Sequence, residues 1–377
     1  MNKILFLTAS TLAFLTFMNS CSKNETNINN CQERSNIYSL ERKNNVSIIF
    51  KLDSLTSPNL DYIKLVTIND TLFFTLLNSF TNTIYCYEYK SKKIYKTIPL
   101  TSKKKLTGYE IINWNKILTY QYWSNNLTLQ DNTGSILKSI VVPSHGGSYY
   151  SLPTSHAPII YKDKSIYLAG GMMSRSKPSK IAPIVAQIDS SLSKISYLYH
   201  YPDIYTKLYF GGSHYHMDLT YTYNPHQDFF VFNFPASHKL FVTKDFVNEL
   251  EYCAGSEFIE SIPEYRNNED DNALKFCTEN GFYFAILYDQ YNDCYYRICL
   301  LPSKWNELNP FDRDLSVIIL DKDFNVVGEK RLKNNFDFYF KGISCICVSP
   351  DGLLFRQAND SYDESSVSFV SYKLVKR

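Results

Sequence analysis

The sequence lacks several features that would place it in other protein classes. Its charge is nearly balanced, with 39 basic and 37 acidic residues, so it has no basic footprint and we expect no nucleic-acid partner. No apolar run beyond residue 17 is long enough to cross a bilayer as a helix. No stretch after that run shows a useful length of the 3.6-residue periodicity of an amphipathic helix. The lack of helical periodicity favours an all-β chain.

Paired cysteines are also missing. Beyond Cys21 the chain has cysteines at positions 31, 86, 253, 277, 294, 299, 345 and 347, with no CxxC spacing. Most lie inside strand-like runs, where a free cysteine behaves as a small buried hydrophobic residue. Cys345 and Cys347 share a strand face two residues apart, which is a poor geometry for a disulfide. We therefore predict no obligatory disulfide framework.

Motifs of familiar sites are absent or incomplete. No G-x-S-x-G elbow accompanies the SHGG at 144–147, so we interpret its glycines, like Gly170 and Gly171, as points of close backbone approach. The DKDFN at 321–325 resembles the start of a calcium loop, but Val326 stands where glycine is needed. We predict a hairpin turn there.

The N-terminus reads as a targeting segment. Residues 4–17 form an apolar run with the proportions of a secretory signal. An ordinary signal peptide cut near Ser20 is one interpretation. A lipoprotein signal over residues 1–20 is favoured, because Ser20-Cys21 resembles a bacterial lipobox and a polar stretch follows. Cys21 is then the lipidation site, and residues 21–44 form a polar tether.

Sorting signals next to Cys21 indicate the destination. Ser22 rather than aspartate follows the cysteine, which by resemblance to Gram-negative sorting rules predicts an outer membrane lipoprotein anchored through its lipid. Lys23–Glu25 resembles the tags that carry some lipoproteins outward. The periplasmic face and the cell surface both stay open.

The rest of the chain repeats one hairpin pattern. "VSPDGLLF" from Val348 combines a strand-like lead-in, a polar turn and an apolar strand. Its relatives are "TINDTLFF", "NWNKILTY", "YKDKSIYL", "YNPHQDFFV" and "CTENGFYF". A second hairpin follows each of these five relatives, and "SVSFVSYKLVKR" follows "VSPDGLLF". Four strands per unit, repeated at about 45–50 residues plus insertions, is typical of a β-propeller blade.

The last unit is one strand short, and "NVSIIFKLD" at 45–53 is a spare strand that would complete it from the other end. We therefore predict a single all-β domain over 45–377, a β-propeller of six four-stranded blades closed by the N-terminal strand. Irregular stretches at 172–180, 262–273 and 302–314 leave five or seven blades open. Such insertions usually lie at one end of a propeller, where ligands bind.

With these features, residues 21–377 resemble a poorly characterised family of six-bladed, TolB-like β-propeller lipoproteins of Gram-negative anaerobes. The resemblance rests on the lipobox, the spare strand and the hairpin rhythm. It implies a propeller attached to the cell envelope. Because that family has no established catalytic residues, the resemblance implies none here.

One short stretch suggests a metal. In "GGSHYHMD" a strand would place His214, His216 and Asp218 on one face, where two imidazoles and a carboxylate could bind zinc or a similar ion. The alternative is a half-solvated strand whose histidines hydrogen-bond to neighbours. No HExxH motif supports the metal, so we expect the structural role. His145 and His156 are the further histidines that could join such a site.

Aromatic residues give a weaker signal. The 31 tyrosines lie mostly in strand-like alternation, which strand propensity explains. Trp123 and Trp305 lie beside polar, turn-like residues and are candidates for exposed ligand contacts.

Two classes of function follow. The favoured one is a non-catalytic envelope lipoprotein that binds a peptide, glycan or protein on a propeller face. The alternative is a hydrolase or lyase with a site at the channel mouth, possibly metal-dependent, built from His214, His216, Asp218 and His145 or His156. Catalysis needs convergent chemical groups, whereas binding needs only the fold, and fold alone does not imply function.

Overall fold

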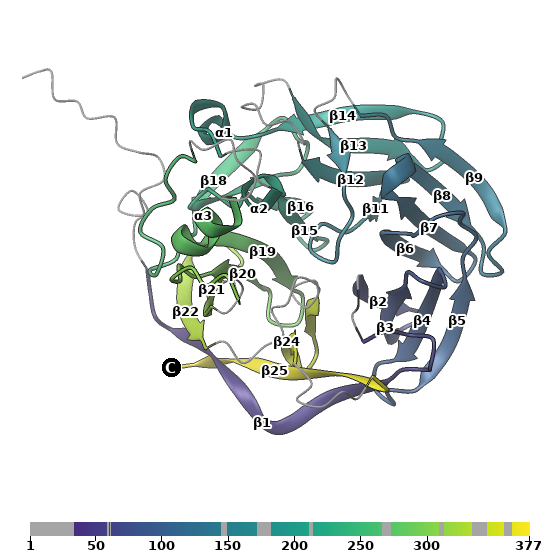
Figure 1. Cartoon of the computed structure of the whole chain (residues 1–377), viewed down its shortest axis with the longest axis horizontal. Helices are drawn as coiled ribbons and strands as arrows, with labels where there is room; N and C mark the ends of the chain where they lie inside the picture. Colours follow the sequence, from purple (N-terminus) through teal and green to yellow (C-terminus); the bar gives the residue numbers. More distant parts are fainter. Residues whose placement is uncertain are drawn as a thin grey trace, which may run out of the picture.

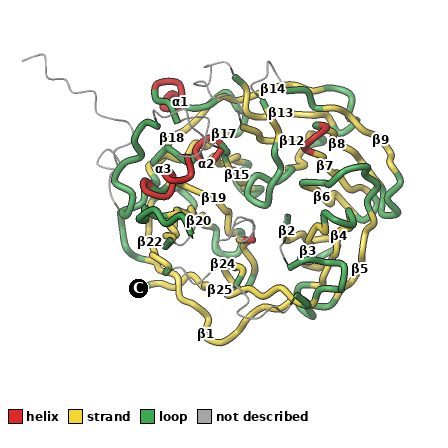
Figure 2. The backbone as a smooth tube through the Cα atoms, viewed as in Figure 1, coloured by secondary structure: helices red, strands yellow, loops and turns green. Residues whose placement is uncertain are grey.

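The structure, a computed structural model of the chain, describes residues 34–377 except 59, 61, 145–148, 172–181, 211–213, 266–272, 309–312, 334–344 and 358–363. Six antiparallel sheets stand around a central axis, which confirms the predicted six-bladed β-propeller (Figure 1). Most of the regular structure is strand, and α1, α2 and α3 gather on one side of the ring (Figure 2).

The six blades follow chain order, with the first strand of each nearest the axis and the fourth at the rim (Figure 1). Blade 1 contains β2 (Ile63–Ile68), β3 (Thr71–Asn78), β4 (Thr83–Glu88) and β5 (Ile94–Pro99). Blade 2 contains β6 (Gly108–Asn113), β7 (Lys116–Gln121), β8 (Asn126–Gln130) and β9 (Ile136–Val141). Blade 3 contains β11 (Ile160–Lys162), β12 (Ser165–Gly171), β13 (Pro183–Asp189) and β14 (Ile195–His200), and β10 (Tyr150–Ser151) extends it by pairing with β12.

Blade 4 contains β15 (Thr220–Asn224), β16 (Phe229–Asn233), β17 (Lys239–Thr243) and β18 (Glu249–Cys253). Blade 5 contains β19 (Phe282–Asp289), β20 (Cys294–Leu300), β21 (Leu315–Leu320) and β22 (Val326–Leu332). Blade 6 contains β23 (Ile346–Ser349), β24 (Gly352–Arg356), β25 (Ser366–Lys376) and β1 (Tyr38–Lys51). The helices are η2 (Tyr122–Ser124), α1 (Asp203–Lys207), α2 (His214–Met217) and α3 (Ala273–Asn280).

The N-terminal strand closes the ring. β1 pairs antiparallel with β25, from Tyr38 opposite Lys376 to Lys51 opposite Ser366, and supplies the fourth strand of blade 6. It begins at Tyr38, seven residues before the expected start. Its buried side chains include Leu40 and Phe50, which join the cores on either side of blade 6. Joining the two ends of the chain in one blade removes an open sheet edge.

Buried aromatic side chains fill the spaces between the blades. Tyr62, Tyr109, Tyr221 and Tyr283 are each almost wholly enclosed. Burying a tyrosine hydroxyl costs free energy unless the hydroxyl makes a hydrogen bond. The Tyr109 hydroxyl does so by donating to the Thr75 hydroxyl at 2.7 Å. The predicted strand role of the tyrosines therefore agrees with their positions.

The hairpin turns use residues that tolerate positive φ angles. Asn69 and Asp70, at φ 50° and 61°, connect β2 to β3, as expected of a type I′ turn. The DKDFN segment also forms a hairpin turn, between β21 and β22, where the Asp321 carboxylate accepts hydrogen bonds from the backbone N–H groups of Asp323 and Asn325.

Two predictions made from the sequence, one about a hairpin and one about disulfides, were wrong. "CTENGFYF" is not a hairpin: Cys277 to Asn280 end α3, and Gly281, at φ 70°, terminates the helix by donating its N–H to the Cys277 carbonyl. The first hairpin of blade 5 instead turns between Asp289 and Cys294. The prediction of no obligatory disulfide framework missed Cys253, which is disulfide-bonded.

The connections divide between the two ends of the ring. The second and fourth strands of a blade run in the same direction, so the segments that follow them leave at the same end. The described parts of the irregular stretches 262–273 and 302–314 follow β18 and β20 and therefore belong to that end, which we call the loop face. The stretch at 172–180 lies outside the described residues. Insertions collected at one end mark it as the functional face of the propeller.

Candidate functional site: a cavity at the loop face

A cavity of about 380 Å³ opens at the loop face between blades 3, 4 and 5. Its walls come from the end of β12, the starts of β15 and β19, helix α3 and the segments that precede β15 and β21. The lining residues are Leu152, Thr154, His156, Ala157, Ala169, Gly170, Gly171, Tyr215, Asp218, Leu219, Thr220, Pro235, Leu274, Cys277, Thr278, Phe282, Phe284, Leu300 and Arg313. A volume of this size is typical of a small-molecule site.

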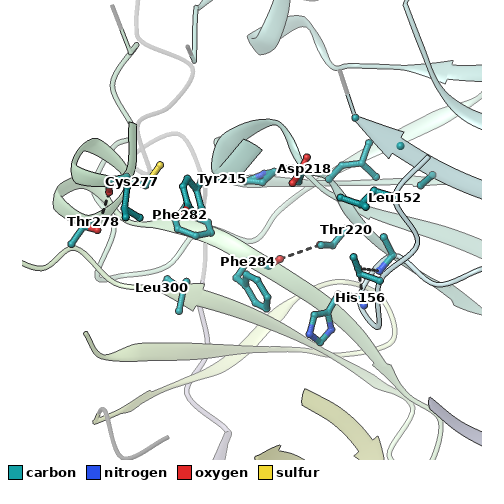
Figure 3. A pocket seen from close by; sticks show the side chains of 18 of the residues that line it. Leu152, His156, Tyr215, Asp218, Thr220, Cys277, Thr278, Phe282, Phe284 and Leu300 are labelled. Atoms are coloured by element: carbon teal, nitrogen blue, oxygen red, sulfur yellow. Dashed lines mark hydrogen bonds between the residues drawn. The ribbon is translucent and has the colours of Figure 1, made fainter. Parts of the chain in front are cut away.

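The walls are mostly apolar. Phe282 and Phe284 from β19 present their rings to the cavity, with Leu300 beside them (Figure 3). His156 lies edge-on to Phe284, with the ring centroids 5.2 Å apart. This surface can cover the apolar body of a ligand.

Two glycines at the end of β12 shape one wall. A Cβ atom at Gly170 would collide with the carbonyl oxygen of Tyr150, so only glycine lets β10 approach β12 here. A Cβ atom at Gly171 would lie 3.2 Å from the Asp218 carboxylate. The interpretation as a point of close backbone approach is confirmed at Gly170.

Asp218 is the carboxylate of the cavity. Protein surrounds the residue, but its side chain stays accessible because it faces the cavity (Figure 3). Burial raises the pKa of this carboxyl to about 7. The group therefore changes its charge near neutral pH.

Arg313 is the cation of the cavity. Its side chain is only 5% exposed, and Nη1 donates to the Cys277 carbonyl at 2.9 Å. The guanidinium lies over the Phe282 ring, 5.0 Å from the centroid, while Nε has no hydrogen-bond partner. Burial lowers the pKa of Arg313 to about 10, which still leaves it charged at neutral pH.

His216 lies behind this cavity wall. Its Nδ1 is 3.1 Å from the Cys277 thiol, and its ring packs between Phe276 and Phe282. Burial, with the nearby Arg313 charge, lowers the pKa of His216 to about 3. The imidazole is therefore neutral at physiological pH.

The expected strand over the histidines is wrong. Residues 214–217 form the short helix α2, in which alternate residues do not share a face. Tertiary hydrogen bonds hold this turn: the hydroxyls of Tyr205 and Tyr201 donate to the carbonyls of His216 and Met217, both at 2.8 Å. As a result His216 points into an aromatic cluster, while Asp218 points into the cavity.

The structure thus brings together only part of the predicted site. His156 and Asp218 line the same cavity, and His216 lies behind its wall. The side chain of His214 and all of His145 lie outside the described residues. Within the described part of the chain, no three His, Cys, Asp or Glu side chains are grouped to hold a metal ion.

The two candidate tryptophans lie elsewhere. Trp123, in η2, is 74% exposed, and its ring makes a T-shaped contact with Tyr122 at a centroid distance of 5.1 Å. Trp305 is half-buried in the connection that precedes β21. Neither lines the cavity.

Sequence reasoning missed Arg313 and Cys277. Arg313 lies in a stretch interpreted only as a loop, and its contact with Cys277 joins residues 36 positions apart. Arg313 stands between Asp312 and Asp314 in the sequence, which indicates an ordinary solvated charge and gives no signal of a buried cation.

A buried hydrogen-bond network connects to a side chain of the cavity wall. Arg297, on β20, donates from Nε to the Asn233 side-chain oxygen at 2.7 Å. The Asn233 amide in turn donates to the Thr220 hydroxyl, which belongs to the cavity lining, at 2.9 Å. This chain links blade 5 to blade 4 and fixes one side chain of the cavity wall.

Comparisons with known proteins agree with the fold. The family DUF4221, described as a domain of unknown function, matches residues 38–331. A crystal structure of a DUF4221 member from Bacteroides vulgatus is 21% identical, with a TM-score of 0.75 over 91% of this chain and 100% of that one. A putative exported protein from Bacteroides fragilis is 12% identical, with a TM-score of 0.53 over 90% and 96% of the two chains. No curated protein matches the sequence.

Proposed function

Because this chain belongs to the DUF4221 family, whose description assigns no activity, we propose its function from the cavity: a cell-envelope lipoprotein that binds a small ligand at its loop face. The cavity between blades 3, 4 and 5 carries this proposal. It combines apolar walls with a few convergent polar groups, which is the usual composition of a ligand site.

Binding is favoured over catalysis by the side chains that reach the cavity. A hydrolase or lyase needs an acid and a base, or a metal, converging on one point. His216, the proposed partner of Asp218, faces an aromatic cluster instead and is neutral. Asp218 and Arg313 can orient a ligand without any chemical step.

The envelope location rests on the N-terminal sequence. The apolar run at 4–17 and the Ser20-Cys21 pair support export and lipidation. The Bacteroides fragilis protein of similar fold is described as a putative exported protein, which agrees with this. None of the described helices is long and apolar enough to span a membrane.

Lipidation can be tested in cells supplied with a fatty-acid analogue. The protein should take up the label and stay in the membrane fraction, and Cys21→Ser should lose both. A Cys21→Ser protein that keeps the label would contradict the anchor.

Ligand binding can be tested with the apolar anion 8-anilinonaphthalene-1-sulfonate. We expect one saturable site in the purified protein. Leu152→Trp, which enlarges a side chain of the cavity wall, should abolish it. Leu137→Trp, at an exposed position on β9, serves as the matched control and should keep it. Equal probe binding in the two variants would contradict the proposal.

A further inference from the structure

The cavity contains one cation and one carboxylate that are not paired with each other. Arg313 makes one hydrogen bond to a carbonyl and, among the described residues, no ion pair. Asp218 likewise has no ion-pair partner in the described part of the chain. A buried charge without a partner is costly, so Arg313 is better satisfied by an opposite charge supplied from outside. The Asp218 carboxylate is accessible in the cavity and can accept a cation there.

These two groups lie at different ends of the cavity. Arg313 is attached to the Cys277 end through its hydrogen bond, whereas Asp218 lies toward Leu152 and Gly171 (Figure 3). Tyr215 also lines the cavity. Its pKa is raised chiefly by burial and then by Cys277; the Arg313 charge lowers it and the Asp218 charge raises it. A ligand that satisfies both ends must therefore carry its two charges apart.

The space between the ends is apolar. Phe282, Phe284, Leu219 and Leu300 line it, and no other charged side chain belongs to the described lining. A dipeptide spans roughly 7 Å between its ends and presents its side chains sideways. Its size is compatible with a cavity of about 380 Å³.

We propose that the cavity binds a short apolar peptide with free ends, its carboxylate on Arg313 and its ammonium group on Asp218. This inference rests on the proposed binding function and specifies the ligand class. Arg313 belongs to the cavity lining, so its guanidinium can supply the positive charge for a carboxylate. The aromatic walls would cover the two apolar side chains.

Blocked peptides test both ends on the unaltered protein. Calorimetric titration should detect binding of leucyl-phenylalanine. The C-terminal amide and the N-acetyl form should each bind at least about 30-fold more weakly, because each removes one of the two charge pairs. If either blocked form, or octanoate, binds as tightly as the free dipeptide, the proposal is overturned.

Two variants assign each end of the peptide to its residue. In Arg313→Met the free dipeptide and its amide should bind alike, and in Asp218→Asn the free and N-acetyl forms should bind alike. Arg331→Met, which removes an exposed arginine, should keep both preferences. Preferences that persist in Arg313→Met and Asp218→Asn would overturn the proposed orientation.

The outcome also separates this inference from the proposed function. If no dipeptide binds while 8-anilinonaphthalene-1-sulfonate still enters the cavity, the peptide proposal is wrong and the binding site stands. If neither compound binds there, both proposals fail.

Discussion

Replacing Arg297 with methionine should lower the free energy of unfolding by about 3–5 kcal/mol. The Arg297 side chain is 0% exposed. Besides the bond to Asn233, Nη1 donates to the Ala254 carbonyl at 2.8 Å and Nη2 to the Ser237 carbonyl at 2.7 Å. The guanidinium also lies over the Tyr283 ring, 3.7 Å from the centroid.

The magnitude of the loss follows from the hydrogen-bond acceptors that lose their donor when Arg297 is replaced. Methionine has a similar length but no donor, so three buried oxygens would lose their partner. Each buried acceptor left unsatisfied costs about 1–3 kcal/mol. The removed desolvation penalty of the cation offsets part of this sum, which gives the lower total stated above.

Urea denaturation followed by circular dichroism measures the change. Arg331→Met is the matched control, because Arg331 is 55% exposed and pairs with Asp314 at the surface. We expect the control to change stability by no more than about 1 kcal/mol. A loss below about 1 kcal/mol for Arg297→Met would refute the account of this network as the link between blades 4 and 5.

Three further predictions concern closure and pH. Deleting β1 (Tyr38–Lys51) should expose the edge of β25, lower the melting temperature and promote aggregation, and a deletion that melts like the intact protein would contradict the closure. His216 has a folded-state pKa of about 3 against 6.5 when unfolded, so the unfolded state binds more protons between these values. The free energy of unfolding should therefore fall by about 2 kcal/mol from pH 6.5 to 5. Urea titrations at several pH values measure this dependence, and His216→Gln should remove the part of it that His216 causes. Asp218 has a raised folded-state pKa of about 7, so the folded protein loses stability as the pH rises from 4 to 7 and this carboxyl becomes charged. Asp218→Asn should therefore have a higher melting temperature than the unaltered protein at pH 8, and the difference should be smaller at pH 5.

The strands of the propeller were predictable because their signals are local. Asn69-Asp70 and Asp163-Lys164 adopt the positive φ angles that two-residue hairpin turns need, and the flanking residues alternate. The closing strand was predictable by elimination, since the last blade lacked one strand and one strand near the N-terminus had no blade. Local signals failed to place its start, which is at Tyr38.

The two helices near the cavity were not predictable in this way. Gly281 has a positive φ angle, which serves a helix C-terminus as well as a hairpin turn, so the residues "TENG" predict a turn where a helix ends. The alternating pattern of His214 and His216 is overridden by hydroxyls of Tyr201 and Tyr205, which reach the helix from the preceding connection. Long-range contacts of this kind leave no local pattern in the sequence.

The candidate site was predictable in composition more than in geometry. His156 and Asp218 were selected for their chemistry, and they line one cavity although 62 positions separate them. Arg313 could not be selected, because its importance comes from being buried beside Cys277 and Phe282 without an opposite charge. Burial of a loop arginine depends on the packing of blades 4 and 5 and cannot be derived from its neighbours in sequence.

A crystal structure of the protein with 8-anilinonaphthalene-1-sulfonate tests the central claim most directly. The account predicts that the probe occupies the cavity between blades 3, 4 and 5, with its rings against Phe282 and Phe284 and its sulfonate on Arg313. A structure in which the probe binds elsewhere while the cavity contains only water would contradict the claim that this cavity is the ligand site.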